Sequence, residues 1–245
     1  MIPAAPEANR SNVAALIPAF LEETLISEIV RRALLELDHV LVVDDGSSDA
    51  TASKAELAGA QVIRHPANRG KGAAIKTGLR ELAARGFLYC LILDGDGQHL
   101  PEEIPRFLAA ANQSQSHLLV GNRMSDTKTM PLARRMTNSF MSGQISRLCG
   151  QPIPDTQCGF RMIHHDLAPY LDCPSNAYEY ETEMLLIAAR RGFRISAVPI
   201  TTVYGDEKSK IRPVRDTIRF LRLLHRYRRA DAGAEADRQR QSVGD

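Results

Sequence analysis

The chain of 245 residues contains no tryptophan, and phenylalanine and tyrosine together make up only 5% of it. Its formal net charge is +2. These values argue against the aromatic stacking platform and the strongly basic surface that are typical of nucleic-acid-binding proteins, so we expect no nucleic-acid partner. The four cysteines lack the CxxC spacing of a zinc site, which favours buried, reduced thiols in a cytosolic protein.

Several familiar sequence patterns are also absent. No apolar run approaches the roughly 20 residues that span a bilayer, and residues 1–11 lack the basic and apolar regions of a secretion signal. No GxGxxG follows the first predicted strand, and Gly70-Lys71-Gly72 lacks the first glycine and the Ser/Thr of a P-loop. Lys71 could still approach a phosphate, or it could be an ordinary solvated lysine of a loop.

What the sequence does contain is a regular alternation of apolar runs and amphipathic segments. Apolar runs without polar alternation that alternate with helices predict a parallel sheet covered by helices on both faces, hence an α/β fold. We predict strands over residues 13–17, 39–43, 61–64, 87–93, 117–120, 160–163 and 194–203. We predict helices after Thr24, after Ser48 or Asp49, and over residues 73–85, 101–111, 131–149, 179–191 and 213–228. These elements predict a single domain over residues 12–228, with disordered ends at 1–11 and 229–245.

Acidic side chains follow two of these strands at the point where each strand ends. Asp94 and Asp96 follow the strand at 87–93, and Asp44 and Asp45 follow the strand at 39–43. Ligands of open α/β sheets bind outside the carboxyl ends of the strands, and crowded carboxylates there require a cation or other donors. The alternative is that both clusters are turns or helix caps. We favour a site for a hard divalent cation and a phosphate.

Six segments then occur in the order found in family 2 glycosyltransferases. The chain most resembles the branch that contains dolichyl-phosphate mannose synthase and dolichyl-phosphate glucosyltransferase, over about residues 12–225. The resemblance implies the GT-A fold and transfer of a sugar, with inversion, from a nucleotide diphosphate sugar. The segments are VAALIPAFLE (13–22), VVDDGSSD (42–49), NRGKG (68–72), LDGDGQHLP (93–101), GNR (121–123) and DTQCGFR (155–161).

The same resemblance implies a donor site with a divalent cation, Mg²⁺ or Mn²⁺. Asp96 and Gln98 would be the metal ligands, and Arg123 would offer a planar guanidinium to a phosphate. A surface ion pair is the alternative for Arg123. The chain departs from the family at Tyr204 and Gly205, where an arginine is expected before the basic loop. The residues implied to bind the nucleotide sugar are Pro18, Ala19, Phe20, Glu22, Val43, Asp45, Lys71, Asp94, Gly95, Asp96, Arg123, Ser209 and Lys210.

Asp155 resembles the family position that faces the acceptor. It would be a general base towards a hydroxyl acceptor, whereas a lipid phosphate needs no base and Asp155 would then position other groups. Asp94, Arg123 and Glu183 complete the predicted catalytic set. Glu183 could instead be a favourable charge in the first turn of its helix.

We therefore expect an enzyme of cell-envelope biogenesis that moves a hexose from UDP-glucose or GDP-mannose to polyprenyl phosphate. The alternatives are a saccharide hydroxyl acceptor, and a catalytically weak nucleotide-sugar-binding protein. A phosphohydrolase of the haloacid dehalogenase type is disfavoured, because Gly97-Gln98 follow the DxD and three strands precede it. We expect a cytoplasmic protein, either a monomer or a homo-oligomer. Its terminal amphipathic helix either packs on the protein's own core or lies on the inner face of a membrane.

Overall fold

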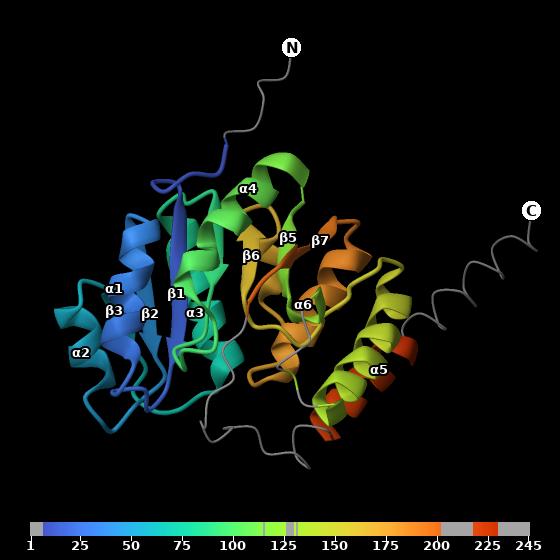
Figure 1. Ribbon diagram of the computed structural model, residues 1–245. Helices are drawn as coiled ribbons and strands as arrows, with labels where there is room; N and C mark the ends of the chain where they lie inside the picture. The colour runs from blue at the N-terminus through green and yellow to red at the C-terminus, as the bar shows by residue number, and fades with distance from the viewer. Residues whose placement is uncertain (1–6, 115, 126–129, 131, 202–217, 230–245) are drawn as a thin grey trace, which may run out of the picture. The chain divides into compact units, whose positions relative to one another are not determined.

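The computed structural model describes residues 7–114, 116–125, 130, 132–201 and 218–229 (Figure 1). Contacts divide the chain into two compact units, residues 1–207 and 208–245, and each is described by itself. The first unit contains a seven-stranded sheet in the order β3-β2-β1-β4-β6-β5-β7. The strands are β1 (Val13–Ala19), β2 (His39–Asp44), β3 (Gln61–Arg64), β4 (Tyr89–Ile92), β5 (Leu118–Asn122), β6 (Arg161–His164) and β7 (Ile195–Pro199).

The central strand β1 is buried along its whole length. It pairs in parallel with β2 on one side and with β4 on the other, which agrees with its continuous apolar sequence. The expected mostly parallel sheet is confirmed. The exception is β6, which runs antiparallel between β4 and β5. The amino end of β6 therefore lies at the same edge of the sheet as the carboxyl ends of its neighbours.

Helices cover both faces of the sheet. On one face α1 contacts α2 and α4, whereas α3 packs against β1 and β2 on the other face and contacts α6 there (Figure 1). The longer α5 packs against α6. The α-helices are α1 (Ile26–Glu36), α2 (Thr51–Leu57), α3 (Lys71–Ala84), α4 (Ile104–Ser114), α5 (Leu132–Cys149) and α6 (Glu179–Arg190).

Helix ends differ from the prediction in a few places. Thr24 does not cap α1, because that helix begins at Ile26 after Leu25 and has no side-chain cap. Asp49 does accept a hydrogen bond from the backbone N–H of Thr51, at 3.1 Å, where α2 begins. The predicted helix from residue 101 begins instead with a short 3-10 turn, η1 (Pro101–Glu103). Two more 3-10 turns, η2 (Arg123–Ser125) and η3 (Ala168–Leu171), were not predicted.

The two ends of the chain are described only in part. Residues 7–12, part of the segment for which disorder was predicted, form a turn in which Asn9 Oδ1 accepts hydrogen bonds from Ser11 and Asn12. In the second unit, residues 218–229 form a helix that buries Leu223, Leu224 and Tyr227. No helix in the described part of the chain is both long and apolar enough to cross a membrane.

Gly78 of α3 is required by the packing of that helix on β1. A Cβ atom at Gly78 would lie 2.2 Å from Cδ1 of Leu16, which is fully buried. We predict that Gly78→Ala lowers the free energy of unfolding by about 1–3 kcal/mol through overpacking. Urea denaturation measures this value.

Gly143 in α5 is the matched control, because it is also helical but nothing lies within 4 Å of its added Cβ. There the higher helix propensity of alanine should raise the free energy of unfolding by up to about 1 kcal/mol. Equal effects of the two substitutions would contradict the close packing of α3 on β1.

Candidate active site

The predicted site residues gather at one edge of the sheet, where β1, β2 and β4 end. Pro18 pairs with Val43 and Ala19 with Asp44 in the register of β1 and β2. The backbone N–H of Asp45 then donates to the carbonyl oxygen of Ala19, at 2.8 Å. The residues predicted to bind the nucleoside therefore lie on two adjacent strand ends.

The carboxylate of Asp45 holds the loop that follows β3. It is buried and accepts hydrogen bonds from the backbone N–H groups of Arg69, at 3.0 Å, and Gly70, at 2.7 Å. His65 Nδ1 lies 2.7 Å from the same carboxylate, and His65 Nε2 lies 2.9 Å from Thr77 Oγ1 in α3. Asp45 thus has a structural role at this edge beside the predicted nucleoside contact, and His65 was not predicted from the sequence.

The acidic turn at residues 94–98 lies against the end of β1. A Cβ atom at Gly95 would lie 3.3 Å from Cγ of Glu22. The backbone N–H of Glu22 donates to Thr51 Oγ1, at 2.9 Å, so α2 also helps to place this segment. Phe20 and Glu22 are each partly exposed beside it. The turn after β4 therefore lies next to the segment that follows β1.

Lys71, the first residue of α3, joins two carboxylates. Its Nζ lies 2.7 Å from Asp94 Oδ1 and 2.9 Å from Glu181 Oε1 in α6. Burial alone would lower the pKa of Lys71, but the attraction of Asp94 and Glu181 outweighs it and raises the pKa. Burial would raise the pKa of Asp94, but Lys71 and then His99 lower it. The alternative of a solvated loop lysine is therefore wrong.

The backbone at Gly159 lies directly against the ion pairs of Lys71 with Asp94 and Glu181. A Cβ atom at that position would lie 2.8 Å from Asp94 Oδ2, 3.0 Å from Glu181 Oε1 and 3.1 Å from Lys71 Nζ. A side chain there would collide with Asp94 and would press tightly against Glu181 and Lys71. The glycine of the DTQCGFR segment thus lets the backbone approach the ion pairs closely.

Glu181 rather than Glu183 is the acidic residue of α6 that reaches Lys71. Because α6 begins at Glu179, Glu183 falls in its second turn, and the alternative of a first-turn charge is wrong. Glu183 is buried and accepts a hydrogen bond from the backbone N–H of Ser175, at 3.3 Å. Its catalytic role stays a prediction.

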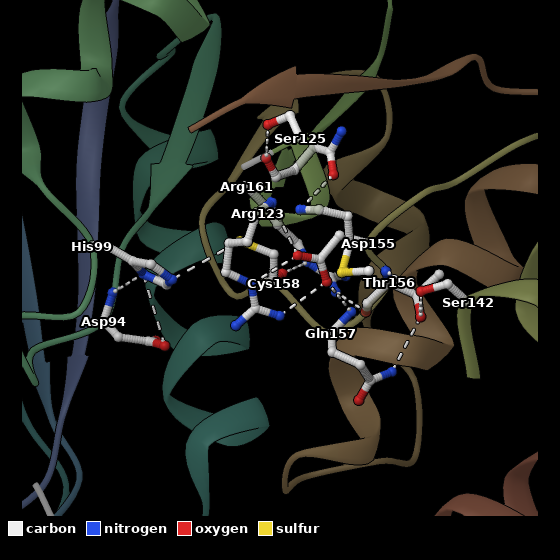
Figure 2. A network of polar contacts seen from close by, with 12 residues as sticks. Asp94, His99, Arg123, Ser125, Ser142, Asp155, Thr156, Gln157, Cys158 and Arg161 are labelled. Atoms are coloured by element: carbon white, nitrogen blue, oxygen red, sulfur yellow. Dashed lines mark hydrogen bonds and ion pairs between the residues drawn. The ribbon is translucent and has the colours of Figure 1, made fainter. Parts of the chain in front are cut away.

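Arg123 and Asp155 form a second ion pair at the same edge, shown in Figure 2. Arg123 Nε donates to Asp155 Oδ2 at 2.7 Å, and Nη2 donates to Oδ1 at 2.9 Å. The backbone N–H groups of Arg123 and Gln157 donate to the same carboxylate, at 3.1 and 3.2 Å. Only 1% of Asp155 is exposed. The pair is thus buried and bidentate, so the alternative of a surface ion pair is wrong.

His99 connects the acidic turn to the segment that carries Asp155. Its Nδ1 accepts a hydrogen bond from the backbone N–H of Asp94, at 3.2 Å, and its Nε2 lies 3.9 Å from Cys158 Sγ (Figure 2). The ring stacks on Phe160, with 5.2 Å between the centroids. Burial lowers the pKa of His99 to about 4, so the imidazole is neutral at pH 7.

Arg161 holds the other end of that segment. Its guanidinium is fully buried and donates to the backbone carbonyl oxygens of Cys158, at 2.9 Å, Thr156, at 3.0 Å, and Glu181. Neither His99 nor Arg161 was predicted as a site residue, although both lie within the quoted segments. Arg161 begins the buried strand β6, and a charged residue at the start of an apolar run is the sequence signal that could have identified it.

The acidic turn offers only oxygen ligands to a metal ion. Asp96 is partly exposed, and its Oδ1 accepts the backbone N–H of Gln98, at 3.0 Å, which places the two predicted metal ligands side by side. Carboxylate and amide oxygens are the ligands that Mg²⁺ and Mn²⁺ prefer, so the residues fit the cation. The predicted residues Ser209 and Lys210, and the departure at Tyr204 and Gly205, lie outside the described residues.

The model of the glycosyl transferase family 2 matches residues 14–170, from β1 through the antiparallel β6. Of the site residues, Glu181, Glu183, Ser209 and Lys210 lie beyond that range. The chain belongs to glycosyltransferase family 2. A UDP-N-acetylglucosamine–dolichyl-phosphate N-acetylglucosaminyltransferase of Methanococcus voltae is 30% identical to it, over 78% of this chain and 85% of that protein. A polyprenol monophosphomannose synthase of Mycolicibacterium smegmatis is 32% identical, over 76% of this chain and 75% of that protein.

Solved structures agree on the fold. Glucosyl-3-phosphoglycerate synthase from Mycobacterium tuberculosis, in complex with Mn²⁺, UDP and phosphoglyceric acid, matches with a TM-score of 0.65 and 17% identity. The match covers 88% of this chain and 76% of that chain. The family 2 chain is thus an enzyme with a GT-A-like fold that transfers a sugar from a nucleotide sugar. The phosphohydrolase alternative is wrong, because that enzyme class is a different family.

We predict that Lys71→Met leaves Asp94 and Glu181 without their shared cation. Breaking a buried ion pair costs several kcal/mol, but 22% of the Asp94 side chain is exposed and solvent screens part of that loss. The free energy of unfolding should fall by about 3 kcal/mol, measured by urea denaturation at pH 7. At that pH the bridge is intact. Its contribution is complete between the ordinary pKa values of Asp94 and Lys71, and it is lost as the pH rises through the raised pKa of Lys71 or falls through the lowered pKa of Asp94.

Lys54→Met is the control, because Lys54 pairs with Glu23 at 3.6 Å on an exposed surface. That substitution should change the free energy of unfolding by less than about 1 kcal/mol. A Lys71 variant as stable as the Lys54 variant would show that the buried bridge contributes nothing to the fold.

Proposed function

We propose that this family 2 enzyme transfers a hexose from UDP-glucose or GDP-mannose to polyprenyl phosphate, with inversion at the transferred sugar. The observation that carries the proposal is the meeting of the acidic turn at residues 94–98, Lys71 and the Arg123–Asp155 pair at one sheet edge. A cation held by Asp96 and Gln98 would neutralise charge that develops on the departing nucleoside diphosphate.

The residues around the turn support a diphosphate donor. Lys71 already places a positive charge beside Asp94, and its ammonium can exchange one carboxylate for a phosphate oxygen without entering water. Asp45 holds the backbone of the loop just before Lys71. Phe20 and Glu22 are partly exposed and would contact the nucleoside. Solved structures of glucosyl-3-phosphoglycerate synthase contain UDP with either Mn²⁺ or Mg²⁺, which supports a cation of this kind.

The hydrogen bonds and the burial of Asp155 favour a phosphate acceptor over a hydroxyl acceptor. A general base must offer an oxygen within hydrogen-bond reach of the proton that it removes. Both oxygens of Asp155 accept donors from Arg123, and the carboxylate is buried. A lipid phosphate is already ionised and needs no base, so Asp155 acts by holding Arg123. The names of relatives near 30% identity, which act on dolichyl phosphate or polyprenol, support the same acceptor class.

The acceptor class also implies where the enzyme works. Polyprenyl phosphate is anchored in a bilayer by its hydrocarbon chain, so the proposed reaction takes place at a membrane surface. The described helix at residues 218–229 carries five arginines and the exposed Ile218 and Leu221, a composition suited to an anionic bilayer surface.

A turnover panel tests the donor and the acceptor together. Purified protein is given UDP-glucose, GDP-mannose or UDP-N-acetylglucosamine with Mg²⁺ or Mn²⁺, and either a short polyprenyl phosphate or a free saccharide. We expect cation-dependent transfer to the polyprenyl phosphate, and loss of both transfer and metal-dependent nucleotide binding in Asp96→Ala.

Asp172→Ala is the control for that variant, because Asp172 pairs with Arg80 on an exposed surface, at 2.7 Å. It should keep parental turnover. Transfer to the saccharide alone would refute the proposed acceptor, and full activity of Asp96→Ala would refute the metal assignment.

A double-mutant cycle tests the role of Asp155. If Asp155 acts by holding Arg123, then Asp155→Asn and Arg123→Lys should each lower kcat by about tenfold or more. Because the two residues would act as one unit, the kcat of the double variant should be no lower than that of the less active single variant. The pH dependence of kcat should keep its acidic limb in Asp155→Asn.

A different result would identify Asp155 as a general base. A fall of roughly 10²–10⁴-fold in Asp155→Asn together with loss of the acidic limb is the signature of general base catalysis. Donor affinity and the thermal unfolding midpoint are measured alongside, to separate lost chemistry from lost folding.

A further inference from the structure

Three ligand-bearing side chains lie together at the edge of the sheet opposite the active site. His117 precedes β5, His164 ends β6, and Asp166 follows two residues later. The antiparallel register of β5 and β6 sets His117 opposite His164, whose backbone N–H donates to the carbonyl oxygen of His117, at 2.8 Å. His164 also pairs with Tyr89, which begins β4, whereas Asp94 lies beyond the far end of that strand, roughly 16 Å away at ~3.3 Å per residue.

The spacing of these groups suits a metal ion. One ligand atom from each of the three residues lies within 4.8 Å of the other two. His164 Nδ1 is 3.3 Å from Asp166 Oδ2, which is about the separation of two ligands at 2.0–2.1 Å from one tetrahedral ion. His117 would have to move closer by a small rotation of its side chain.

A cation beside His164 Nδ1 would relieve the repulsion between a lone pair on that nitrogen and the carboxylate of Asp166. His164 Nδ1 lies 3.3 Å from the backbone N–H of Asp166, which needs a lone pair on that nitrogen. The same Nδ1 faces the carboxylate Oδ2 of Asp166 at 3.3 Å, where a lone pair would be repelled.

His117 supplies an independent observation. Its Nδ1 is buried and has no hydrogen-bond partner among the described residues. Such an atom loses its water on folding without a replacement, which is unfavourable unless a ligand satisfies it. His117 and His164 pack edge to face, with 5.5 Å between ring centroids, so the ring of His117 already lies beside that of His164.

We propose that His117, His164 and Asp166 bind a first-row transition-metal ion with a preference for imidazole, of which Zn²⁺ is the probe. Two imidazoles and one carboxylate favour Zn²⁺, Co²⁺ or Ni²⁺ over the Mg²⁺ and Mn²⁺ that suit the all-oxygen turn at residues 94–98. His165 Nε2 lies 3.4 Å from Asp166 Oδ1 and orients the carboxylate from its other side. The ion would link the start of β5 to the turn after β6.

The test is Zn²⁺ binding by the full chain after chelator treatment, in the presence of excess Mg²⁺ to occupy oxygen sites. We expect one equivalent of Zn²⁺ and a rise in the thermal unfolding midpoint. His117→Gln and Asp166→Asn should each weaken Zn²⁺ binding by about 100-fold or more, because each removes a direct ligand and the loss of an outer partner alone costs about 10–100-fold. Asp166 is exposed, so its variant should fold like the parent.

His39→Gln is the matched control, since His39 is also at a strand start on this edge but is outside the cluster. It should bind Zn²⁺ as the parent does. Co²⁺ absorption of the parental protein gives a second measurement that needs no variant, and it should show a tetrahedral site with nitrogen and oxygen ligands. No Zn²⁺ binding, unchanged affinity in both variants, or a thiolate signature from a cysteine site would overturn the proposal. Because the sites are separate, these outcomes are independent of the transferase activity.

Discussion

The arrangement of the active site depends on the ammonium of Lys71 between the carboxylates of Asp94 and Glu181. Three elements meet at this bridge, since Lys71 begins α3, Asp94 follows β4 and Glu181 lies in α6. Two partly buried carboxylates so close together would repel each other without a cation. The fold therefore needs a positive charge between these carboxylates, and Lys71 supplies it. The proposed donor is negatively charged and would need a positive charge at the same place.

The antiparallel direction of β6 places the segment that carries Asp155 and Gly159 near Lys71. A parallel strand in its position would carry the segment before it to the opposite edge of the sheet. Because β6 is reversed, Asp155 and Gly159, which precede it, lie beside Arg123 at the end of β5 and beside Asp94 at the end of β4. The fully buried guanidinium of Arg161 fixes this segment through backbone carbonyl oxygens, so that its position does not depend on a bound ligand.

Much of this could be predicted from the sequence, for a clear physical reason. Strands such as β1 and β2 are continuous apolar runs, and parallel strands place whatever follows them at one edge, so the meeting of Asp45 and Asp94 follows from local pattern alone. The reversal of β6 could not be predicted, because a short buried run such as Met162–Ile163 has the same composition in either direction. The choice between Glu181 and Glu183 depends on where α6 begins, and helix ends are the least certain feature of a sequence pattern.

The NRGKG segment has a consequence for donor choice. Its Gly70 N–H donates to Asp45, which is proposed to face the nucleoside, and the next residue, Lys71, carries the charge that is proposed to face the diphosphate. One peptide unit thus joins the residues proposed for the two ends of the donor. In the proposed site, a substitution that moves the loop held by Asp45 would also shift the ammonium of Lys71, so base preference and catalytic rate would change together.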